Sequence, residues 1–470
     1  MSAVMSALGL RLERVLEATG GSLVAPAPGG LVLRSVSIDS RTLEPGALFV
    51  AIRGPRFDGH DFVAAAQAKG AVAAIVEREL EAPPPGLPLV RVADTTRALA
   101  LLARHVRRAT SVPVVAVTGS VGKTTTKDMT AELLGLRGPV LKTEGNLNNQ
   151  YGLPLTLLRL TDEHSAVVLE LGMSAAGELR ALAAVAEPDV AVITRIAPVH
   201  LEFFASLEAL ALAKAEILEG LKPAGTAVLN GDDPLVRRIG ERFPGRVVWF
   251  GRDRRFDVSA ESWRGTAFGM RFDLRIGGRA TDVALPLAGP HFVENFLAAA
   301  AAAHVLGMAP DSIAEAATRM RPARHRGELR RLGEGVIVLD DCYNSSPVAL
   351  EAAVVALGLV PGLRRIAVVG DMLELGDTGP RLHREAGRGL AGRVDVVVGI
   401  GPLAEEILAG AREAGLPAQA LVHFADALSA KDAVASLVTP GDAVLVKASR
   451  GMRLEQVIDA LTARFGEAAS

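Results

Sequence analysis

The chain contains few of the residues from which disulfide frameworks and strongly charged surfaces are built. It has one cysteine, Cys342, in 470 residues, which excludes a disulfide framework and a cysteine-based zinc site and fits a reducing compartment. Its 51 basic residues nearly balance its 53 acidic residues, giving a net charge of -2. This balance argues against a nucleic-acid surface that depends on bulk charge, but it leaves room for a local anion site.

Long apolar segments are missing as well. The longest apolar run, residues 296–303, is stopped by His304 and falls far short of the ~20 residues needed to cross a bilayer. The start of the chain has no basic head before its apolar part, which Arg11, Glu13 and Arg14 interrupt, so it does not resemble a signal peptide. We therefore expect a cytoplasmic protein without a membrane span or a nucleic-acid partner, and we expect a monomer.

The composition and the order of apolar runs predict an α/β protein with several domains. Apolar residues make up 49% and charged residues 22% of the chain, as in ordinary soluble proteins. At ~150 residues per domain, the length corresponds to about three domains. Residues 1–108 carry short apolar runs separated by polar turns, which predict a small N-terminal α/β domain.

The apolar runs of residues 109–470 favour two larger sheets. Residues 109–322 alternate continuous apolar strands with helix-length segments, which indicates a buried parallel sheet. Between residues 246 and 288 the apolar period drops toward two, which adds an antiparallel insertion, and an Ala-rich helix over 292–307 closes this central domain. Residues 323–470 have the spacing of a Rossmann-like doubly wound sheet, which binds ligands at the ends of its strands.

The strongest local motif follows the first central strand, in VVAVTGSVGKTTTKDM (residues 114–129). Glycines allow backbone N–H groups to close around phosphate oxygens, Lys123 adds a positive charge, and Thr124 offers a hydroxyl to Mg²⁺. Residue 117 is Val where a full P-loop has Gly, so the motif is shortened. The alternative is an ordinary strand–turn–helix capped by threonines. The candidate nucleotide-binding residues are Gly119, Ser120, Val121, Gly122, Lys123, Thr124 and Thr125.

Polar residues after the next strands are weaker candidates. Glu170 ends a strand beside the loop and is placed to hold the Mg²⁺ of ATP, although a solvated glutamate is an equal alternative. His200 follows the third strand, where a lone histidine is usually a loop or core residue. The cluster Asn146, Asn148 and Asn149 either forms turns or contacts a polar substrate through its amides.

In the C-terminal part, Asp340 and Asp341 end a strand, where ligands gather in such sheets. A run of arginines precedes them. Such a run is normally a solvated face, and an arginine directed at a γ-phosphate is the alternative. The arginines are Arg324, Arg326, Arg330 and Arg331.

Taken together, these segments resemble the Mur ligase family of peptidoglycan precursor synthesis over essentially the whole chain. DSR (39–41) and GALFVAIRGPRFDGHDF (46–62) are similar to the family's uridine-nucleotide-binding domain, and TGSVGKTT (118–125) is similar to its ATP loop, which also lacks the outer glycine. The branch that adds D-alanyl-D-alanine is the most similar in its signatures. These are TEGNLNNQYGLPLTLL, LDDCYNSSP, GDMLELGDTGPRLHREAG and, except for Ala448, KASRGMRLE. The Asp-Asn-Pro-Arg motif of the diamino-acid-adding relatives is absent.

The resemblance implies roles for single residues. His200 would help to hold a second Mg²⁺, and Lys214 would be a carbamate that offers an anionic oxygen to Mg²⁺, its alternative being a solvated helix lysine next to Glu216. Asn295 would lie beside adenine. The family often has Asn where this chain has Phe292, so stacking of the Phe292 ring on adenine is the hypothesis that replaces an amide contact. Arg326 would reach the phosphates and Asp341 the ribose. Implied substrate contacts are Ser40, Arg41, Asp58, Gly59, His60, Asn146, Asn148, Asn149, Tyr343 and Asn344, and His383 lies in a signature without an assigned role.

The implied activity is ATP-dependent amide ligation with two Mg²⁺ ions. The carboxylate of UDP-MurNAc-tripeptide attacks the γ-phosphoryl group, and the amine of D-alanyl-D-alanine displaces phosphate from the acyl phosphate, giving the pentapeptide. Alternatives are an NTPase switch, an idle scaffold and a Mur ligase that adds one amino acid. The guanine-binding Asn-Lys-x-Asp motif is absent, and an idle protein need not retain Lys123, Glu170 and Lys214 together. Lysine and diaminopimelate both stay open at the third peptide position.

Overall fold

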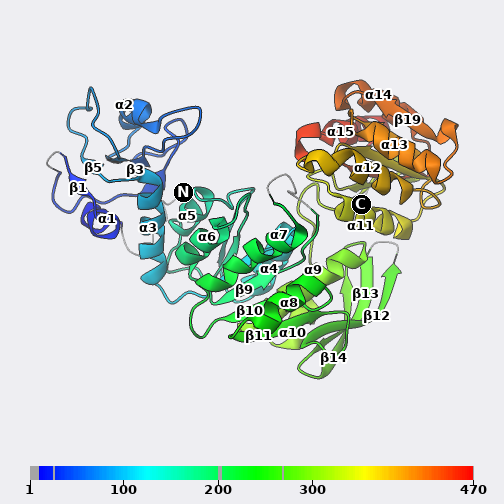
Figure 1. Ribbon diagram of the computed structural model, residues 1–470, viewed down its shortest axis with the longest axis horizontal. Coiled ribbons are helices and arrows are strands. Elements are labelled where there is room, and N and C mark those ends of the chain that lie inside the picture. Colours follow the sequence, from blue (N-terminus) through cyan, green and yellow to red (C-terminus); the bar gives the residue numbers. More distant parts are fainter. Residues whose placement is uncertain (1–9, 25–26, 199–203, 267–268, 469–470) are drawn as a thin grey trace. The chain divides into compact units, whose positions relative to one another are not determined.

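The computed structural model describes residues 10–24, 27–198, 204–266 and 269–468. The chain divides into two compact units, and Figure 1 labels their helices and strands. Unit 1 comprises Met1–Thr118, Leu134–Val192 and Ala213–Ala227, and unit 2 comprises Gly119–Leu133, Ile193–Leu212 and Val228–Ser470. Three sheets take their strands from the three predicted segments, which confirms the three-part α/β fold, while the boundaries at 108/109 and 322/323 stay predictions.

The N-terminal sheet has the order β1-β5-β4-β3-β2. Its strands are β1 (Ser22–Leu23), β2 (Ser35–Ser37), β3 (Ala47–Val50), β4 (Ala73–Val76) and β5 (Leu89–Arg91). β2 to β5 pair in parallel and β1 pairs antiparallel to β5. Every residue of β3 and β4 is buried, as expected for continuous apolar strands covered on both faces. The helical elements are α1 (Leu12–Thr19), η1 (Gly59–Phe62), α2 (Val63–Ala68) and α3 (Thr95–Arg108).

The central sheet has nine strands in the order β14-β13-β12-β11-β10-β9-β6-β8-β7. They are β6 (Val114–Thr118), β7 (Val140–Lys142), β8 (Ala166–Glu170), β9 (Val190–Ile193), β10 (Thr226–Asn230), β11 (Arg246–Gly251), β12 (Val258–Thr266), β13 (Gly269–Ile276) and β14 (Arg279–Leu285). The antiparallel insertion is confirmed for β12, β13 and β14. Its predicted start at residue 246 is wrong for β11, which pairs in parallel with β12 and so extends the parallel part of the sheet.

The helices of this segment include the predicted Ala-rich one. They are α4 (Lys123–Gly135), α5 (Gly152–Leu157), α6 (Glu178–Ala186), α7 (Leu207–Ala215), η2 (Glu216–Gly220), α8 (Pro234–Arg242), α9 (Pro290–Val305) and α10 (Pro310–Ala317). In α9, residues 296–303 are all 0% exposed. A helix that is apolar all round lies in a core, which is why the alanine run tolerates no charge.

The C-terminal sheet has the order β15-β16-β20-β17-β18-β19. Its strands are β15 (Glu328–Arg331), β16 (Ile337–Asp340), β17 (Arg365–Gly370), β18 (Val396–Ile400), β19 (Leu421–Phe424) and β20 (Ala443–Lys447). All pairings are parallel except that of β15 with β16. Strands β16 to β20 follow apolar runs of the sequence, whereas the edge strand β15 (ELRR) is polar.

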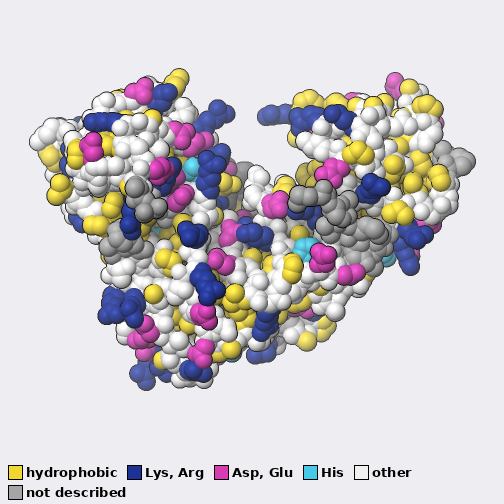
Figure 2. All heavy atoms as spheres, turned by 180° about the vertical axis from the view of Figure 1, so that it is seen from behind, with side chains coloured by type: hydrophobic (Ala, Val, Ile, Leu, Met, Phe, Trp, Pro, Cys, Tyr) yellow, Lys and Arg dark blue, Asp and Glu magenta, His cyan; other side chains and the backbone are white. Residues whose placement is uncertain are grey.

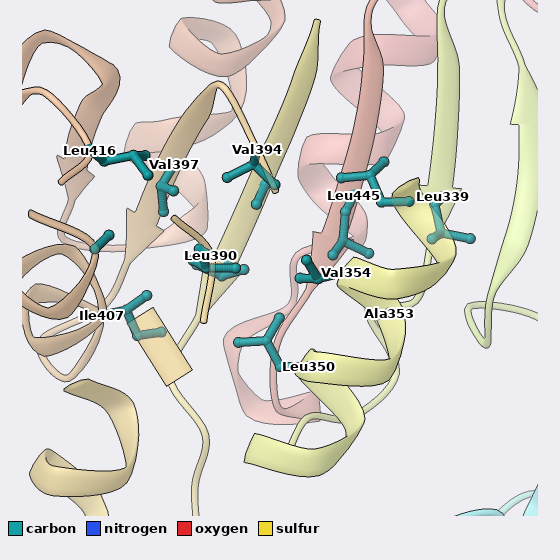
Figure 3. Packing of buried hydrophobic residues seen from close by; sticks show 14 of the residues in the cluster. Leu339, Leu350, Ala353, Val354, Leu390, Val394, Val397, Ile407, Leu416 and Leu445 are labelled. Carbon is teal, nitrogen blue, oxygen red and sulfur yellow. The ribbon is translucent and has the colours of Figure 1, made fainter. Parts of the chain in front are cut away.

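Helices cover both faces of this sheet. They are α11 (Pro347–Leu359), α12 (Gly379–Arg388), α13 (Ala404–Glu413), α14 (Ala427–Leu437) and α15 (Glu455–Phe465), with short η3 (Gly333–Gly335), η4 (Gly376–Thr378), η5 (Ala418–Ala420) and η6 (Arg450–Met452). One buried cluster joins α11, α12 and α13 to the sheet, and another joins α14 and α15. Figure 3 shows the first cluster, in which Leu350, Ala353 and Val354 of α11 lie beside Leu339 and Leu445 of the strands. This arrangement is the predicted doubly wound sheet.

The surface reflects the near balance of charges. On the face seen in Figure 2, basic and acidic side chains are interspersed over the described residues. In the part of the chain that the structure describes, none of the helices combines the length and the apolar character that a bilayer crossing requires.

A buried arginine holds the end of α3 within unit 1. Arg107 is 1% exposed and donates to the carbonyl oxygens of Ala186 (2.9 Å), Val112 (3.1 Å) and Glu187 (2.9 Å) and to Asp189 Oδ2 (2.8 Å). Burial lowers the pKa of Arg107, and the Asp189 carboxylate offsets part of that effect. The helix that ends the predicted N-terminal domain is therefore fixed to central-segment backbone by a charge with four partners.

We expect Arg107→Ala to destabilise unit 1 by about 2–3 kcal/mol, because three backbone carbonyls lose the donor that Arg107 supplies, whereas the half-buried Asp189 carboxylate keeps Lys222 and the Val114 N–H. The neighbouring Arg108 bonds only to Glu187 and is exposed. Arg108→Ala is the matched control and should change stability by less than about 1 kcal/mol. Urea unfolding of both variants measures the difference, and equal effects would contradict the role of Arg107.

Candidate nucleotide site and associated clusters

The glycine-rich loop between β6 and α4 folds tightly against the segment after β9. Ser120 N–H donates to the Arg195 carbonyl at 2.6 Å, and Thr194 Oγ1 donates to the Val121 carbonyl at 2.6 Å. Gly119 has a φ of +151°, and a Cβ at this position would overlap Thr194 Oγ1. The loop therefore approaches its neighbour more closely than a side chain would permit.

Gly122 shows the same constraint on the other side of the loop. Its φ is +85°, in the left-handed region that favours glycine, and a Cβ would overlap Oδ1 of Asn295. Asn295 Oδ1 also accepts from Thr126 Oγ1 at 3.5 Å. Asn295 of α9 thus lies against the start of α4. Its predicted contact with adenine stays a prediction.

The polar groups of the loop converge on the start of α4. Lys123 Nζ donates to the carbonyls of Gly119 (2.9 Å) and Ser120 (3.3 Å), so its ammonium lies over the loop. Ser120 Oγ is buried and has no hydrogen-bond partner among the described residues. Thr124 and Thr125 occupy the first turn of α4, where the helix dipole favours an anion. A cationic group, a buried hydroxyl and a helix N-terminus together suit a polyphosphate.

Glu170, in unit 1, ends β8 directly opposite Val117 of β6. Its side chain is 4% exposed, Asn148 Nδ2 donates to its Oε1 at 2.8 Å, and its own N–H donates to Thr143 Oγ1 at 3.0 Å. The alternative of a solvated glutamate is therefore wrong. A buried carboxylate at this strand end is an oxygen donor suited to Mg²⁺.

The asparagine cluster divides into two roles. Asn148 supports Glu170, and its carbonyl accepts from Gly172 N–H at 2.9 Å. Asn149 Oδ1 accepts from the N–H groups of Tyr151 (3.1 Å) and Gly152 (3.0 Å) at the start of α5, which is the turn-forming alternative. Asn146 is exposed.

Lys214, also in unit 1, is only 2% exposed, so the alternative of a solvated helix lysine is wrong. The neighbouring Glu216 accepts the N–H of Gly177 on both carboxylate oxygens at 2.8 Å and lies 3.5 Å from the Arg180 guanidinium. Glu216 therefore has structural partners of its own. His200, the other predicted metal ligand, lies outside the described residues.

Predicted C-terminal residues meet at the ends of β16 and β20. The Arg326 guanidinium lies 4.0 Å from the centre of the Tyr343 ring, a cation–π contact. Lys447, 2% exposed, donates to Asp341 Oδ2 at 2.6 Å and to the Asn344 carbonyl at 3.0 Å. Sequence reasoning did not select Lys447 as a site residue. The signal was a lysine that ends the otherwise apolar strand AVLVK.

The N-terminal candidates form a hydrogen-bonded loop. His60 Nε2 accepts from Glu77 N–H at 2.9 Å, so its Nδ1 carries the proton and donates to Asp58 Oδ1 at 2.5 Å. Asp58 is partly desolvated, which raises its pKa, but hydrogen bonds from His60 and Arg78 outweigh this and bring the pKa to about 2. Gly59 allows close approach, because a Cβ there would lie 2.7 Å from the Ile52 backbone.

The other N-terminal candidates lie on the turn after β2. Ser40 is half-buried, and Arg41 is exposed and donates from Nε (2.9 Å) and NH2 (2.7 Å) to the Asp39 carboxylate. The hydrogen bonds from Arg41 lower the pKa of Asp39 to about 2. The turn thus presents a rigid guanidinium to solvent.

Phe292 and His383 are both buried. The Phe292 ring is 2% exposed, packs against Gly327 and lies 4.3 Å from the His291 ring, so it has no free face for the predicted stacking in this arrangement. His383 Nδ1 donates to the Gly379 carbonyl at 2.7 Å and its Nε2 accepts from Met372 N–H at 2.8 Å. Burial lowers the pKa of His383, and this neutral ring holds the loop after β17 to α12.

Family models match three parts of the chain. The model described as Mur ligase family, catalytic domain, matches residues 32–107; Mur ligase middle domain matches residues 117–303; and Mur ligase, glutamate ligase domain, matches residues 325–450. These matches account for most of the sequence.

Several similar proteins cover nearly the whole chain. The UDP-N-acetylmuramoyl-tripeptide–D-alanyl-D-alanine ligase of Bacillus subtilis is 35% identical, with 95% of this chain and 97% of that protein covered. The protein of the same name from Escherichia coli is 38% identical, with coverages of 92% and 94%. Among solved structures, MurF from Acinetobacter baumannii has a TM-score of 0.89 at 32% identity, covering 98% and 99%. MurF ligase from Thermotoga maritima, solved in complex with ADP, has a TM-score of 0.82 at 32% identity, covering 92% and 97%.

We expect Gly122→Ala to weaken adenine-nucleotide binding by about tenfold or more, since a left-handed alanine costs about 1–3 kcal/mol and its methyl group would displace Asn295. Gly135→Ala at the end of the same helix is the matched control, because a Cβ there meets nothing within 4 Å. Calorimetric titration with ATP measures both affinities. Unchanged affinity in Gly122→Ala would show that the loop does not bind the nucleotide.

Proposed function

The chain belongs to the Mur ligase family, and we propose that it is the ATP-dependent ligase that joins D-alanyl-D-alanine to UDP-N-acetylmuramoyl-tripeptide. The observation that carries this proposal is the glycine loop at residues 119–122, with Lys123 folded over it, in a chain whose full-length relatives share that name. ATP is the nucleotide, in keeping with the ADP-bound relative. The product is the UDP-MurNAc-pentapeptide of peptidoglycan synthesis.

Within this proposal, the loop residues bind the ATP phosphates. Backbone N–H groups of the loop and the N-terminus of α4 face the anion, and Lys123 would exchange its loop carbonyls for phosphate oxygens. Arg326, whose guanidinium stacks on the Tyr343 ring, would add a second cation at the phosphates. Asp341, which accepts a hydrogen bond from Lys447, would contact the ribose. Both cations offset the charge that builds up as a carboxylate meets a phosphoryl group.

Four residues would hold Mg²⁺: Thr124, Glu170, His200 and Lys214. The donor chemistry fits, because a hydroxyl and a buried carboxylate are oxygen ligands. Lys214 fits as a carbamate, since burial disfavours an ammonium and CO₂ adds to an uncharged amine. When bound, Mg²⁺ supplies charge neutralisation between the two anionic reactants.

The proposed reaction has two steps. The terminal tripeptide carboxylate attacks the γ-phosphoryl group, and ADP leaves. The amine of D-alanyl-D-alanine then attacks the acyl carbonyl, phosphate leaves, and an amide remains. The chain's residues position the reactants and keep water from the acyl phosphate.

Two further groups of residues would contact the substrates: one would bind the uridine nucleotide and the other the peptides. Arg41 and the Asp58–His60 loop would bind the uridine nucleotide, together with Ser40 beside Arg41 and Gly59 within the loop. In the asparagine cluster and after β16, polar groups would contact the peptides; they are Asn146, Asn148, Asn149, Tyr343 and Asn344. Because Asn148 is bonded to Glu170, it would couple substrate contact to the metal-binding carboxylate.

A substrate matrix tests the proposal. UDP-MurNAc-tripeptides ending in lysine or diaminopimelate are crossed with D-alanyl-D-alanine, D-alanine and L-amino acids, and phosphate and amide are both measured. We expect one phosphate per amide only when a tripeptide nucleotide and D-alanyl-D-alanine are both present. ATP hydrolysis at full rate without peptides would indicate an NTPase switch, amide formation with a single amino acid would indicate a different ligase, and no turnover would indicate a scaffold.

We expect Lys214→Ala to lower the ligase rate by about a hundredfold or more, the scale seen when one group that stabilises transition-state charge is removed. Formate or acetate should restore part of the rate, because a free carboxylate can replace the carbamate oxygens. Lys222→Ala is the control, since Lys222 is a half-buried lysine whose ammonium pairs with Asp189, away from the proposed metal ligands in sequence. Steady-state rates with and without added carboxylate measure the effect. A variant with full activity, or one equally slow with and without carboxylate, would contradict the carbamate.

A further inference from the structure

A buried cluster of three different metal-ligating side chains lies behind the predicted nucleotide residues of the C-terminal segment. His325, Asp340 and Cys342 each offer one ligand atom, and these atoms all lie within 4.8 Å of one another. Asp340 is the last residue of β16, and Cys342 lies in the turn two residues later. None of the three has a role in the proposed ligase reaction.

The turn that carries His325 is built to direct it at Asp340. His325 has a φ of +62°, a left-handed conformation that costs a non-glycine residue free energy and persists only when its surroundings impose it. Two backbone bonds impose it, from Tyr343 N–H to the His325 carbonyl (3.1 Å) and from Gly327 N–H to the Asp340 carbonyl (2.9 Å). His325 Nδ1 lies 2.8 Å from Asp340 Oδ2 as a result.

Asp340 is the second, independent indication of a ligand. Its side chain is 0% exposed, and Oδ1 has no nitrogen or oxygen donor among the described residues, so the weak donor of the nearby Cys342 thiol is all that Asp340 has besides His325. An unpaired oxygen of a buried carboxylate is costly, by about 1–3 kcal/mol or more. Cys342 is 1% exposed and is the only thiol of the chain. An ion seated between these three groups would satisfy the unpaired oxygen.

We propose that His325, Asp340 and Cys342 bind a transition-metal ion of the zinc class. One nitrogen, one oxygen and one sulfur donor form a mixed set that Zn²⁺ or Co²⁺ accepts, whereas Mg²⁺ prefers oxygen alone. With metal–ligand bonds of about 2.0–2.3 Å, tetrahedral ligand atoms lie roughly 3.3–3.7 Å apart, so the cluster needs a rearrangement of about 1 Å. A site built on cysteines is excluded by the single thiol, but here histidine and aspartate supply the other donors.

Two of the three proposed ligands, His325 and Asp340, line a pocket from which a fourth ligand would reach the ion. This pocket of about 370 Å³ is lined by Pro322, Arg324, His325, Glu328, Arg330 and Asp340. Glu328 lies directly opposite Asp340 in the antiparallel β15–β16 pair and shares its face. The positive charge of Arg330 is offset by its ion pair with Glu467. Water from the pocket or the Glu328 carboxylate completes the set.

Metal binding moves protons at two of the ligands. The thiol of Cys342 loses one proton to solvent, the imidazole proton moves from Nδ1 to Nε2, and the metal takes the freed sulfur, Nδ1 and an Asp340 oxygen. The ion would join the 323–327 turn to the end of β16. This tie would hold the turn that carries Arg326, independently of ATP and of ligase activity.

The experiment titrates the metal-free full chain with Co²⁺ in excess Mg²⁺, which fills the hard oxygen sites. The readout is the thiolate-to-cobalt charge-transfer absorption, which only Cys342 can produce. We expect one Co²⁺ per chain, displacement by Zn²⁺, and a higher melting temperature with either ion. Cys342→Ser should abolish the band, and His325→Gln and Asp340→Asn should each weaken Co²⁺ binding by about tenfold or more.

His304→Gln, on α9, is the matched histidine control and should bind as the parent does. Circular dichroism verifies that each variant is folded, and the parent protein's own titration decides the question if a variant is not. No stoichiometric thiolate band in the parent would overturn the proposal. A band of unchanged affinity in both His325→Gln and Asp340→Asn would also overturn it, since a thiol binding alone explains that result. Neither outcome depends on ligase activity, so failure here leaves the proposed function intact.

Discussion

The close approach of a glycine backbone to its neighbours is the constraint on which the rest of the structure depends. At Gly119 and Gly122 the loop leaves no room for a Cβ against Thr194 and Asn295. The loop can take this path because β6 is a buried strand that ends in the loop and α4 begins at once with Lys123. The resulting turn brings an ammonium, a buried hydroxyl and the N-terminus of α4 together, which is chemistry that suits a polyphosphate.

Buried ionisable groups separate structural from functional positions in this fold. Arg107 has four protein partners, so its charge is satisfied by the chain itself and it serves stability. Glu170 and Lys214 are as deeply buried, yet they lie at the end of β8 and in α7, on segments that resemble the metal-binding parts of the family. Asp340 keeps one oxygen unpaired. In Asp340, this oxygen within a buried site is the feature that directs attention to a ligand.

Much of the fold could be predicted because central strands of parallel sheets are continuous apolar runs, as in β6, β8 and β17. The edge strands β1, β7 and β15 are short or polar, and β11 looks like its antiparallel neighbours in sequence although it pairs in parallel. The loop of residues 119–125 was recognisable from local spacing. The burial of single side chains was not recognisable from the sequence, since Lys214 has the local sequence of a solvated lysine but is buried. Whether Asn149 forms a turn or contacts a substrate depends on tertiary contacts.

The central claim is that the nucleotide gripped by this loop gives its γ-phosphoryl group to a carboxylate. The most direct test uses tripeptide nucleotide labelled with ¹⁸O in its terminal carboxylate, in a complete reaction with ATP and D-alanyl-D-alanine. An acyl phosphate predicts that one labelled oxygen leaves the peptide and is found in the released phosphate by mass spectrometry. Phosphate that carries no label, with its new oxygen taken from water, would contradict the account.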